Sequence, residues 1–207
     1  MQSFKQLKFT AMAIAAAVTT LAASSTAQAA DGVRVRGTVV SLTGDTLLVK
    51  SREGDNVSVT LAPGWKAGGI AQARLADIKP GDFVGIASLP TATGGAGALE
   101  VLVFPPAMRG TGEGSYGWDL KPNSSMTNGS VSEAVQSVDG TTVNVVYHGQ
   151  SKKITIAPGT PIVTFAPATN ADVKPGAVVF IPADRADDGK LSTTRVVVGK
   201  NGIVPPM

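Results

Sequence analysis

Apolar and polar residues alternate along several short stretches of the chain, the pattern of β-strands that bury one face. Val57, Val59 and Leu61 alternate with Ser and Thr, and Ile154 and Ile156 alternate with Lys and Thr. Turns rich in Gly, Pro and Asp separate these stretches. The first half of the chain predicts strands near residues 33–42, 45–52, 56–62, 82–88 and 98–104. A short helix is expected at 71–77, between the third and fourth strands.

The pattern occurs twice, which indicates a duplicated unit. Two blocks recur 95 residues later: Leu61–Gly64 as Ile156–Gly159, and Ala76–Gly81 as Ala171–Gly176. Another block near the start of each copy, Ser41–Gly44, matches Ser137–Gly140 at a shift of 96. Because the blocks keep their order and nearly constant spacing, we interpret the chain as two copies of one β unit.

Three strands, a short helix and two further strands follow the order of an OB-like barrel. The predicted fold is therefore all-β, with two tandem OB-like small β-barrels, each of five strands with a short helix between strands 3 and 4. The predicted parts are residues 30–104 for the first barrel, 105–128 for an aromatic-containing connecting loop, and 129–207 for the second barrel with a short C-terminal tail.

The stretches Val35–Val39 and Leu75–Gly85 carry a resemblance. Together with the turn between them, they resemble the OB-like repeats of an uncharacterised family of exported bacterial proteins. The shared motifs are turns and core positions, so the resemblance supports the fold and implies no activity. Some members carry the label metal transporter permease. That label conflicts with this chain, in which no segment after the N-terminal region reaches the ~18 uninterrupted apolar residues of a membrane span.

The N-terminal residues have the pattern of a secretory signal. Lys5 and Lys8 precede an apolar run, and Ala27–Ala29 forms an A-x-A cleavage signal. Residues 1–29 are therefore predicted to be a cleaved signal peptide, with the mature chain in the periplasm or secreted. A membrane anchor is the alternative, but the run is shorter than the ~20 residues that span a bilayer. After cleavage, the chain is expected not to be embedded in a membrane.

Composition narrows the possible chemistry. The 207 residues include no Cys and one His, which excludes thiol nucleophiles, thiolate metal sites and multi-His zinc sites. The net charge of +3 includes two lysines of the signal peptide, so the mature chain is close to neutral. Such a charge gives no strong attraction to nucleic acid. We expect no cofactor and no metal, although an acidic turn leaves weak divalent binding open at Asp184, Asp187 and Asp188.

The segment between the copies holds the candidate site. It carries bulky aromatic residues, which a plain linker lacks. One interpretation is a ligand- or partner-binding loop, with Arg109, Glu113 and Asp119 as polar contacts around an aromatic floor of Tyr116 and Trp118. The other is a structural clasp, in which the two aromatic side chains pin the segment into the groove between the barrels. The sequence leaves both open.

Basic residues cluster on neighbouring predicted strands of the first copy. They are Arg34, Arg36, Lys50 and Arg52, and their counterparts at a shift of 96 are Ser130, Ser132, Val146 and His148. Residues 33–61 contain no aromatic residue on which a base could stack, so single-stranded nucleic acid is not expected as a ligand. The basic side chains are expected to be solvated. A small acidic ligand or anionic glycan is the alternative.

These observations favour a non-enzymatic, exported binding or interaction module with an unknown small ligand or cell-envelope protein as its partner. The alternative is a structural or assembly accessory protein that presents its barrel surface to a cell-envelope partner. An enzyme is disfavoured because the sequence suggests no set of nucleophile, base and orienting group.

Overall fold

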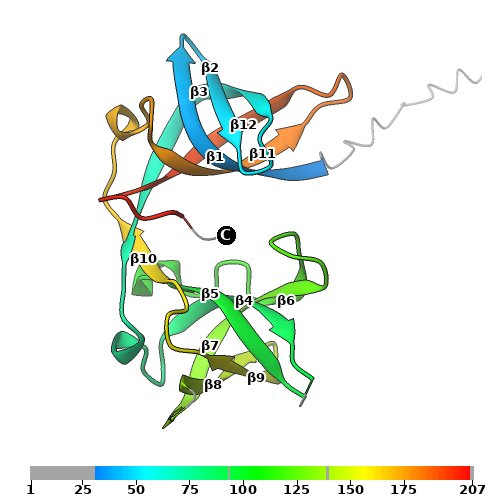
Figure 1. Cartoon of the computed structure of the whole chain (residues 1–207), viewed down its shortest axis with the longest axis vertical. Coiled ribbons are helices and arrows are strands. Elements are labelled where there is room, and N and C mark those ends of the chain that lie inside the picture. Colours follow the sequence, from blue (N-terminus) through cyan, green and yellow to red (C-terminus); the bar gives the residue numbers. More distant parts are fainter. Residues whose placement is uncertain (1–30, 93, 139, 206–207) are drawn as a thin grey trace, which may run out of the picture.

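The computed structural model describes residues 31–92, 94–138 and 140–205 (Figure 1). The predicted signal peptide, residues 1–29, lies outside the described residues. The described chain is all-β, as predicted. Its strands are β1 (Asp31–Thr43), β2 (Thr46–Ser51), β3 (Asn56–Gln72), β4 (Phe83–Pro90), β5 (Ala96–Val103), β6 (Gly114–Trp118), β7 (Ser124–Ser137), β8 (Gly140–Tyr147), β9 (Gln150–Ile156), β10 (Ile162–Ala166), β11 (Val178–Arg185) and β12 (Leu191–Gly199).

The strands are arranged in two lobes, one above the other in Figure 1. In the upper lobe, β1 pairs with β2 and β11, β2 pairs with β3, and β12 pairs with both β11 and β3. These pairings close a five-stranded barrel. Three of its strands come from the first copy and two, β11 and β12, from the second.

The lower lobe has the complementary composition. Here β4 pairs with β5 and β7, β7 with β8, and β8 with β9. Strand β9 meets β5 in a short parallel pairing at Ala96 and Gly97. Two strands of the first copy thus complete a group of three from the second. The predicted arrangement, in which each copy forms its own barrel, differs from these pairings because the last two strands of each copy pair with the other copy.

A strand crossing between the lobes joins them into one sheet. Strand β10 pairs antiparallel with the end of β3 and parallel with β5. The long β3 runs from the barrel of the upper lobe to this junction, well past the predicted end of the third strand at residue 62. The lobes are therefore connected by backbone hydrogen bonds as well as by side chains.

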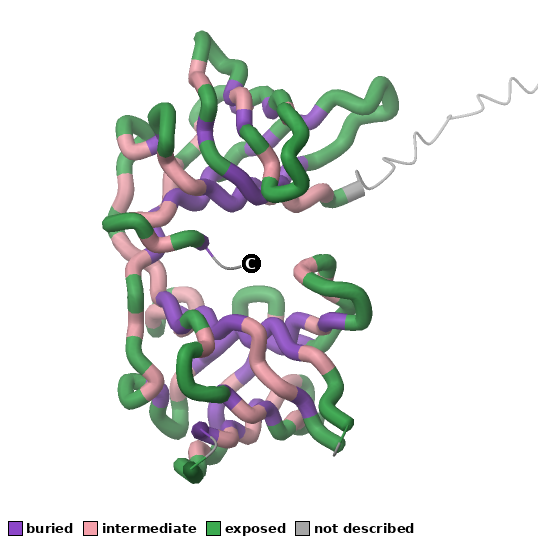
Figure 2. The backbone as a smooth tube through the Cα atoms, viewed as in Figure 1, coloured by how far each residue is buried: buried purple, intermediate pink, exposed green. Residues whose placement is uncertain are grey.

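Buried hydrophobic residues form three clusters. Figure 2 marks the buried positions along the backbone of both lobes. One cluster fills the upper lobe around Leu47 and Ile181, and another fills the lower lobe around Ile86 and Ile154. The third joins residues of both lobes, among them Ile70, Phe83, Leu102, Phe104, Val163, Phe180 and Val197. The space between the lobes thus contains an apolar core of its own.

Two predicted local features differ from the structure. The helix expected at 71–77 is a single 3-10 turn, η1 (Leu75–Asp77), matched in the second copy by η3 (Asn170–Asp172). Strand β3 extends to Gln72, which leaves too few residues for an α-helix before the Pro80-Gly81 turn. The loop expected at 105–128 contains the 3-10 turn η2 (Pro106–Met108), strand β6 and the first residues of β7.

Candidate functional site

Strand β6 positions the aromatic residues of the predicted site. It pairs antiparallel with β7, so that Tyr116 lies opposite Met126 and Trp118 opposite Ser124. The two aromatic side chains contact each other edge to face, with ring centroids 6.1 Å apart. Tyr116 is 41% exposed, whereas the indole Nε1 of Trp118 is buried. The two aromatic residues of the predicted site therefore lie together, at the edge of the lower lobe.

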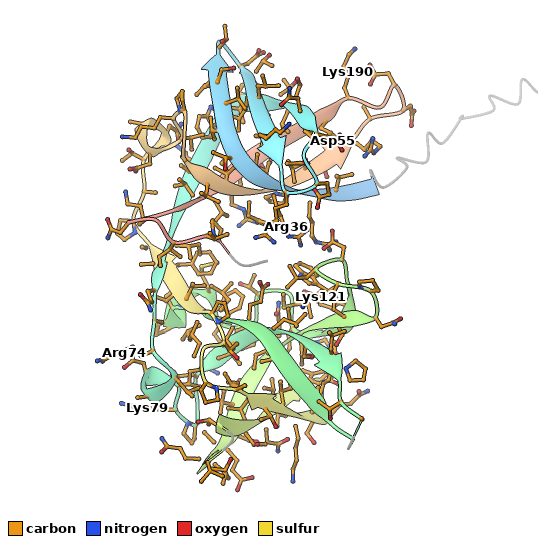
Figure 3. The ribbon with its side chains drawn as sticks, viewed as in Figure 1. Arg36, Asp55, Arg74, Lys79, Lys121 and Lys190 are labelled. Atoms are coloured by element: carbon orange, nitrogen blue, oxygen red, sulfur yellow. The ribbon has the colours of Figure 1, made fainter. Side chains whose placement is uncertain are left out.

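Asp119 joins this edge to the upper lobe. Its carboxylate accepts two hydrogen bonds from the Arg36 guanidinium, at 2.8 and 3.2 Å, and lies 3.7 Å from Arg34 Nη1. Arg36 is only 9% exposed although it lies on the outer face of β1. Figure 3 shows Arg36 extending from the upper lobe toward the lower one. A two-point contact of this kind fixes both distance and orientation between the lobes.

The face of Trp118 is occupied by a side chain of the protein itself. The guanidinium carbon of Arg34 lies 3.9 Å from the centre of the Trp118 ring, within the range of a cation–π interaction. Arg36 lies 5.4 Å from the centre of the Phe180 ring. These contacts favour the clasp interpretation for Trp118 and Asp119.

The other two predicted site residues hold the segment on the lower lobe. Arg109 donates hydrogen bonds to the Ser130 hydroxyl, at 2.9 Å, and to the carbonyl of Gly81. The Glu113 carboxylate accepts a 3.0 Å hydrogen bond from the backbone N–H of His148. The structure thus brings together Tyr116, Trp118 and Asp119, while Arg109 and Glu113 make separate contacts.

The strand register shows which residue of the second copy is equivalent to Arg36, and it differs from the one given by the shift of 96. Arg36 pairs with Phe180 in the upper lobe, and Asn128 pairs with Gly85, the counterpart of Phe180, in the lower lobe. The equivalent of Arg36 is therefore Asn128 rather than Ser132. The β7–β8 hairpin extends two residue pairs farther than β1–β2, which shifts the match.

The basic residues expected to be solvated separate into different environments. Arg34 and Arg36 lie at the contact between the lobes, whereas Lys50 and Arg52 are exposed. For Arg36 the expectation was wrong, because the docked β6–β7 turn covers it. The available sequence signal was the presence of two arginines on the outer face of one strand and an acidic residue beside a Trp elsewhere.

A cavity of about 810 Å³ lies beside this contact. Its wall includes Arg52, whose backbone N–H donates to the carbonyl of Arg36, and Leu120 and Lys121, which directly follow Asp119. The remaining wall includes Gln72, Arg74, Leu75, Leu99, Glu100, Pro158, Thr160, Pro161, Ile162, Val163, Ile203 and Val204. Both lobes and the C-terminal segment therefore contribute, and the wall is apolar with a few charged groups.

The contact between the lobes depends on pH because it includes the carboxylate of Asp119. Burial opposes ionisation of Asp119, but the hydrogen bonds and charge of Arg36, with the charge of Arg34, outweigh it and lower the Asp119 pKa. A carboxyl with a lowered pKa stabilises the fold above its ordinary pKa, and this contribution disappears as pH falls through the lowered value. The contact between the lobes is therefore expected to weaken in acid.

Asp119→Asn tests this contact. We expect it to lower the free energy of unfolding at pH 7 by about 1 kcal/mol, the size of a favourable, partly exposed ion pair. The difference from the unchanged protein should shrink as pH falls from the ordinary carboxyl pKa of about 4 through the lowered pKa of Asp119, below which the native carboxyl is neutral as well. Urea unfolding at several pH values measures both effects. Asp55→Asn, at an exposed turn, is the matched control, and an equal loss in both variants would contradict the assignment.

Comparisons of the chain with protein-family models, with curated proteins and with solved structures found no match. Within residues 31–92, 94–138 and 140–205, no group of three His, Asp or Glu side chains could hold a metal ion. The same residues include no helix long and apolar enough to cross a bilayer. In the acidic turn, Asp188 forms a 2.6 Å ion pair with Lys190.

Proposed function

We propose that this protein is a binding module that holds a small acidic, partly apolar molecule in the cavity between its lobes. The main support for this proposal is the cavity of about 810 Å³, whose wall is formed by residues of both lobes. Its size lies within the range of ligand pockets, which are mostly apolar with a few placed polar groups. This proposal moves the ligand from the aromatic floor around Trp118, which Arg34 covers, to the neighbouring cavity.

The charges on the wall support an acidic ligand. Arg52 and Lys121 line the cavity from opposite lobes, and Figure 3 shows Lys121 at the edge of the lower lobe that faces Arg36. Arg74 also lines it but pairs with Asp77 at 3.0 Å, so its charge is partly compensated. Among the described residues of the wall, Glu100 is the acidic one and is 6% exposed. Within this described lining, cations outnumber carboxylates, and Leu, Ile, Val and Pro side chains supply the apolar surface.

The proposed binding module consists of two OB-like barrels and is exported from the cytoplasm, as the sequence predicts. We infer two OB-like barrels that exchange their last two strands; the parallel pairings β3–β12 and β5–β9 support this order. We also infer export through a signal peptide at residues 1–29, supported by the A-x-A signal before Ala30. An exported, disulfide-free binding module fits the periplasm.

Binding of anilinonaphthalene sulfonate, a fluorescent amphipathic anion, tests the cavity. We expect one molecule per chain, and about tenfold weaker binding in the double variant Arg52→Gln/Lys121→Gln, because charge-assisted contacts are worth ~1.5 kcal/mol or more in total. Native mass spectrometry of protein from the periplasmic fraction then reads two results together: a chain starting at Ala30, and any small molecule that it carries.

The control removes the same charge elsewhere. Lys66 and Lys79 are exposed and lie outside the cavity wall, so Lys66→Gln/Lys79→Gln should bind the dye like the unchanged protein. Equal weakening in both double variants would show a nonspecific charge effect and reject the cavity as the site. Binding of several dye molecules per chain would reject it as well. A melting curve for each variant confirms that the folds are comparable.

A second candidate function rests on the tip of the longer β7–β8 hairpin. Val138 is 97% exposed and Val135 is 51% exposed, so two apolar side chains project into solvent. An exposed apolar tip fits the alternative of an accessory protein that presents a surface to a cell-envelope partner. Two results together would favour this function. The protein would carry no small molecule in its cavity, and crosslinking in whole cells would join this tip to a cell-envelope partner.

A further inference from the structure

A group of polar side chains lies inside the lower lobe, at one end of its core. Ser88, Ser125, Thr127 and Lys152 follow the alternation of the buried residues on their strands; Lys152, for example, shares a face with Ile154 and Ile156. Ser88 and Thr127 are fully buried, whereas Ser125 and Lys152 are partly exposed. The group is thus anchored in the interior and reachable from solvent.

The group is connected by hydrogen bonds. Lys152 Nζ lies 2.8 Å from Ser125 Oγ and 3.4 Å from Thr127 Oγ1. Ser88 Oγ lies 3.4 Å from Ser125 Oγ. The Thr127 hydroxyl also contacts Ser115 Oγ, at 3.0 Å, on the neighbouring β6. Within the described chain, no carboxylate forms an ion pair with Lys152, so hydroxyl groups are its polar partners.

The upper lobe serves as an internal comparison, because strand register identifies the equivalent positions. The pairings Ala183–Val33, Ile181–Val35 and Val57–Val49 in the upper lobe correspond to Ser88–Ser125, Ile86–Thr127 and Lys152–Val145 in the lower lobe. The four polar residues thus replace Ala183, Val33, Val35 and Val57, all of which belong to the apolar cluster of the upper lobe.

This difference carries a cost that the fold does not require. The partly buried ammonium group and the wholly or partly buried hydroxyls lose hydration, and the upper lobe shows that apolar residues fill the same positions. Sites that sacrifice stability in this way are commonly functional ones. The polar end of the lower lobe is therefore best explained by a chemical task.

We propose that Ser125 is a nucleophile and Lys152 its general base, and that the pair attacks the carbonyl carbon of a carboxylic ester or amide. The geometry meets the main requirement of such a pair, a base within hydrogen-bond reach of the nucleophile. Thr127 is a positioning residue, since its hydroxyl holds the Lys152 amine toward Ser125. The site lies apart from the cavity between the lobes, whose wall does not include these residues.

The electrostatic environment suits a base. Burial lowers the pKa of the Lys152 ammonium, which raises the fraction of neutral amine near neutral pH. The neutral amine takes the proton of the Ser125 hydroxyl while Oγ forms a bond to the carbonyl carbon. The tetrahedral intermediate then expels the alcohol or amine, which receives that proton from Lys152. Water hydrolyses the resulting acyl-Ser125 ester and releases the acid, so that the side chains return to their starting state.

Labelling with a fluorophosphonate tests the pair. The Ser125 oxygen would form a bond to phosphorus and fluoride would leave, with the serine proton taken up by Lys152. We expect a single adduct on the full-length protein, mapped to Ser125 by peptide mass spectrometry. Lys152→Val, which installs the residue of the upper lobe, should slow labelling about 100-fold, the usual contribution of a general base. Its melting temperature should be unchanged or higher.

Further variants separate chemistry from structure. Thr127→Val should slow labelling, and Thr127→Ser, which keeps the hydroxyl, should restore it. Ser132, an exposed serine on the same strand, supplies the control Ser132→Ala, which should label like the unchanged protein. Absence of an adduct at Ser125, an equal labelling rate in Lys152→Val, or similar labelling of many serines would overturn the proposal. None of these results depends on dye binding between the lobes.

Discussion

Cutting the chain between Gly110 and Thr111 should leave a nicked protein that remains in one piece. The cut separates β1–β5 from β6–β12, yet each lobe takes strands from both fragments. Separating the fragments would break the β1–β11, β3–β12 and β4–β7 pairings and expose both interiors. A specific protease site inserted at this exposed turn, followed by native mass spectrometry, measures whether the fragments stay together.

The uncut insertion variant is the control for this experiment. Each fragment isolated in denaturant and returned to buffer alone should lack a cooperative unfolding transition, because it holds too few strands to complete either lobe. Mixing the two should restore the transition. Two tandem barrels, in contrast, would give fragments that fold alone. Independent folding of the fragment ending at Gly110 would therefore contradict the exchanged pairings.

The strands and the repeat could be predicted from the sequence, whereas the exchange of strands could not. Alternation identifies the residues that face the interior, but it does not identify the partner strand. The fourth and fifth strands of the two copies present similar interior residues: Val84, Ile86 and Val101 in the first copy, and Val179, Ile181 and Val196 in the second. The last two strands of either copy would therefore fill either lobe. The alternation of apolar and polar residues fits two separate barrels as well as two barrels with exchanged strands.

The sequence identified some residues of the candidate site but not their partners on distant strands. Tyr116, Trp118 and Asp119 stood out by composition in an otherwise plain segment, and the structure brings them together. Their partners Arg34 and Arg36 lie on a strand about 80 residues away, and nothing local distinguishes a covered arginine from a solvated one. Lys152 carried a readable signal, since it occupies an inward position where the first copy has Val57.

Gly37→Ala should be among the most destabilising single substitutions in the upper lobe. A Cβ at Gly37 would lie 2.1 Å from the carbonyl oxygen of Lys50 and 2.8 Å from a methyl group of Val49. The oxygen belongs to the backbone of the paired strand β2 and has no flexible way to retreat. We expect a loss of about 3 kcal/mol, the upper end for overpacking, and a fall in melting temperature of about 10 °C.

The control for this substitution lies on β3. A Cβ at Gly68 meets no atom within 4 Å, so Gly68→Ala should be neutral or slightly stabilising because it restricts the unfolded chain. Equal destabilisation by both substitutions would show that a general loss of glycine flexibility, rather than the contact with Lys50, is responsible.

Gly129 is the residue of the lower lobe that is equivalent to Gly37. A Cβ at Gly129 would lie 2.5 Å from the carbonyl oxygen of Val146, so both repeats require glycine where β1 and β7 cross their partner strands closely. Because strands are exchanged, unfolding one lobe removes strands needed by the other. Gly37→Ala and Gly129→Ala should therefore lower the same single transition in calorimetry. Two transitions, each shifted by only one substitution, would instead indicate lobes that unfold independently despite their shared strands.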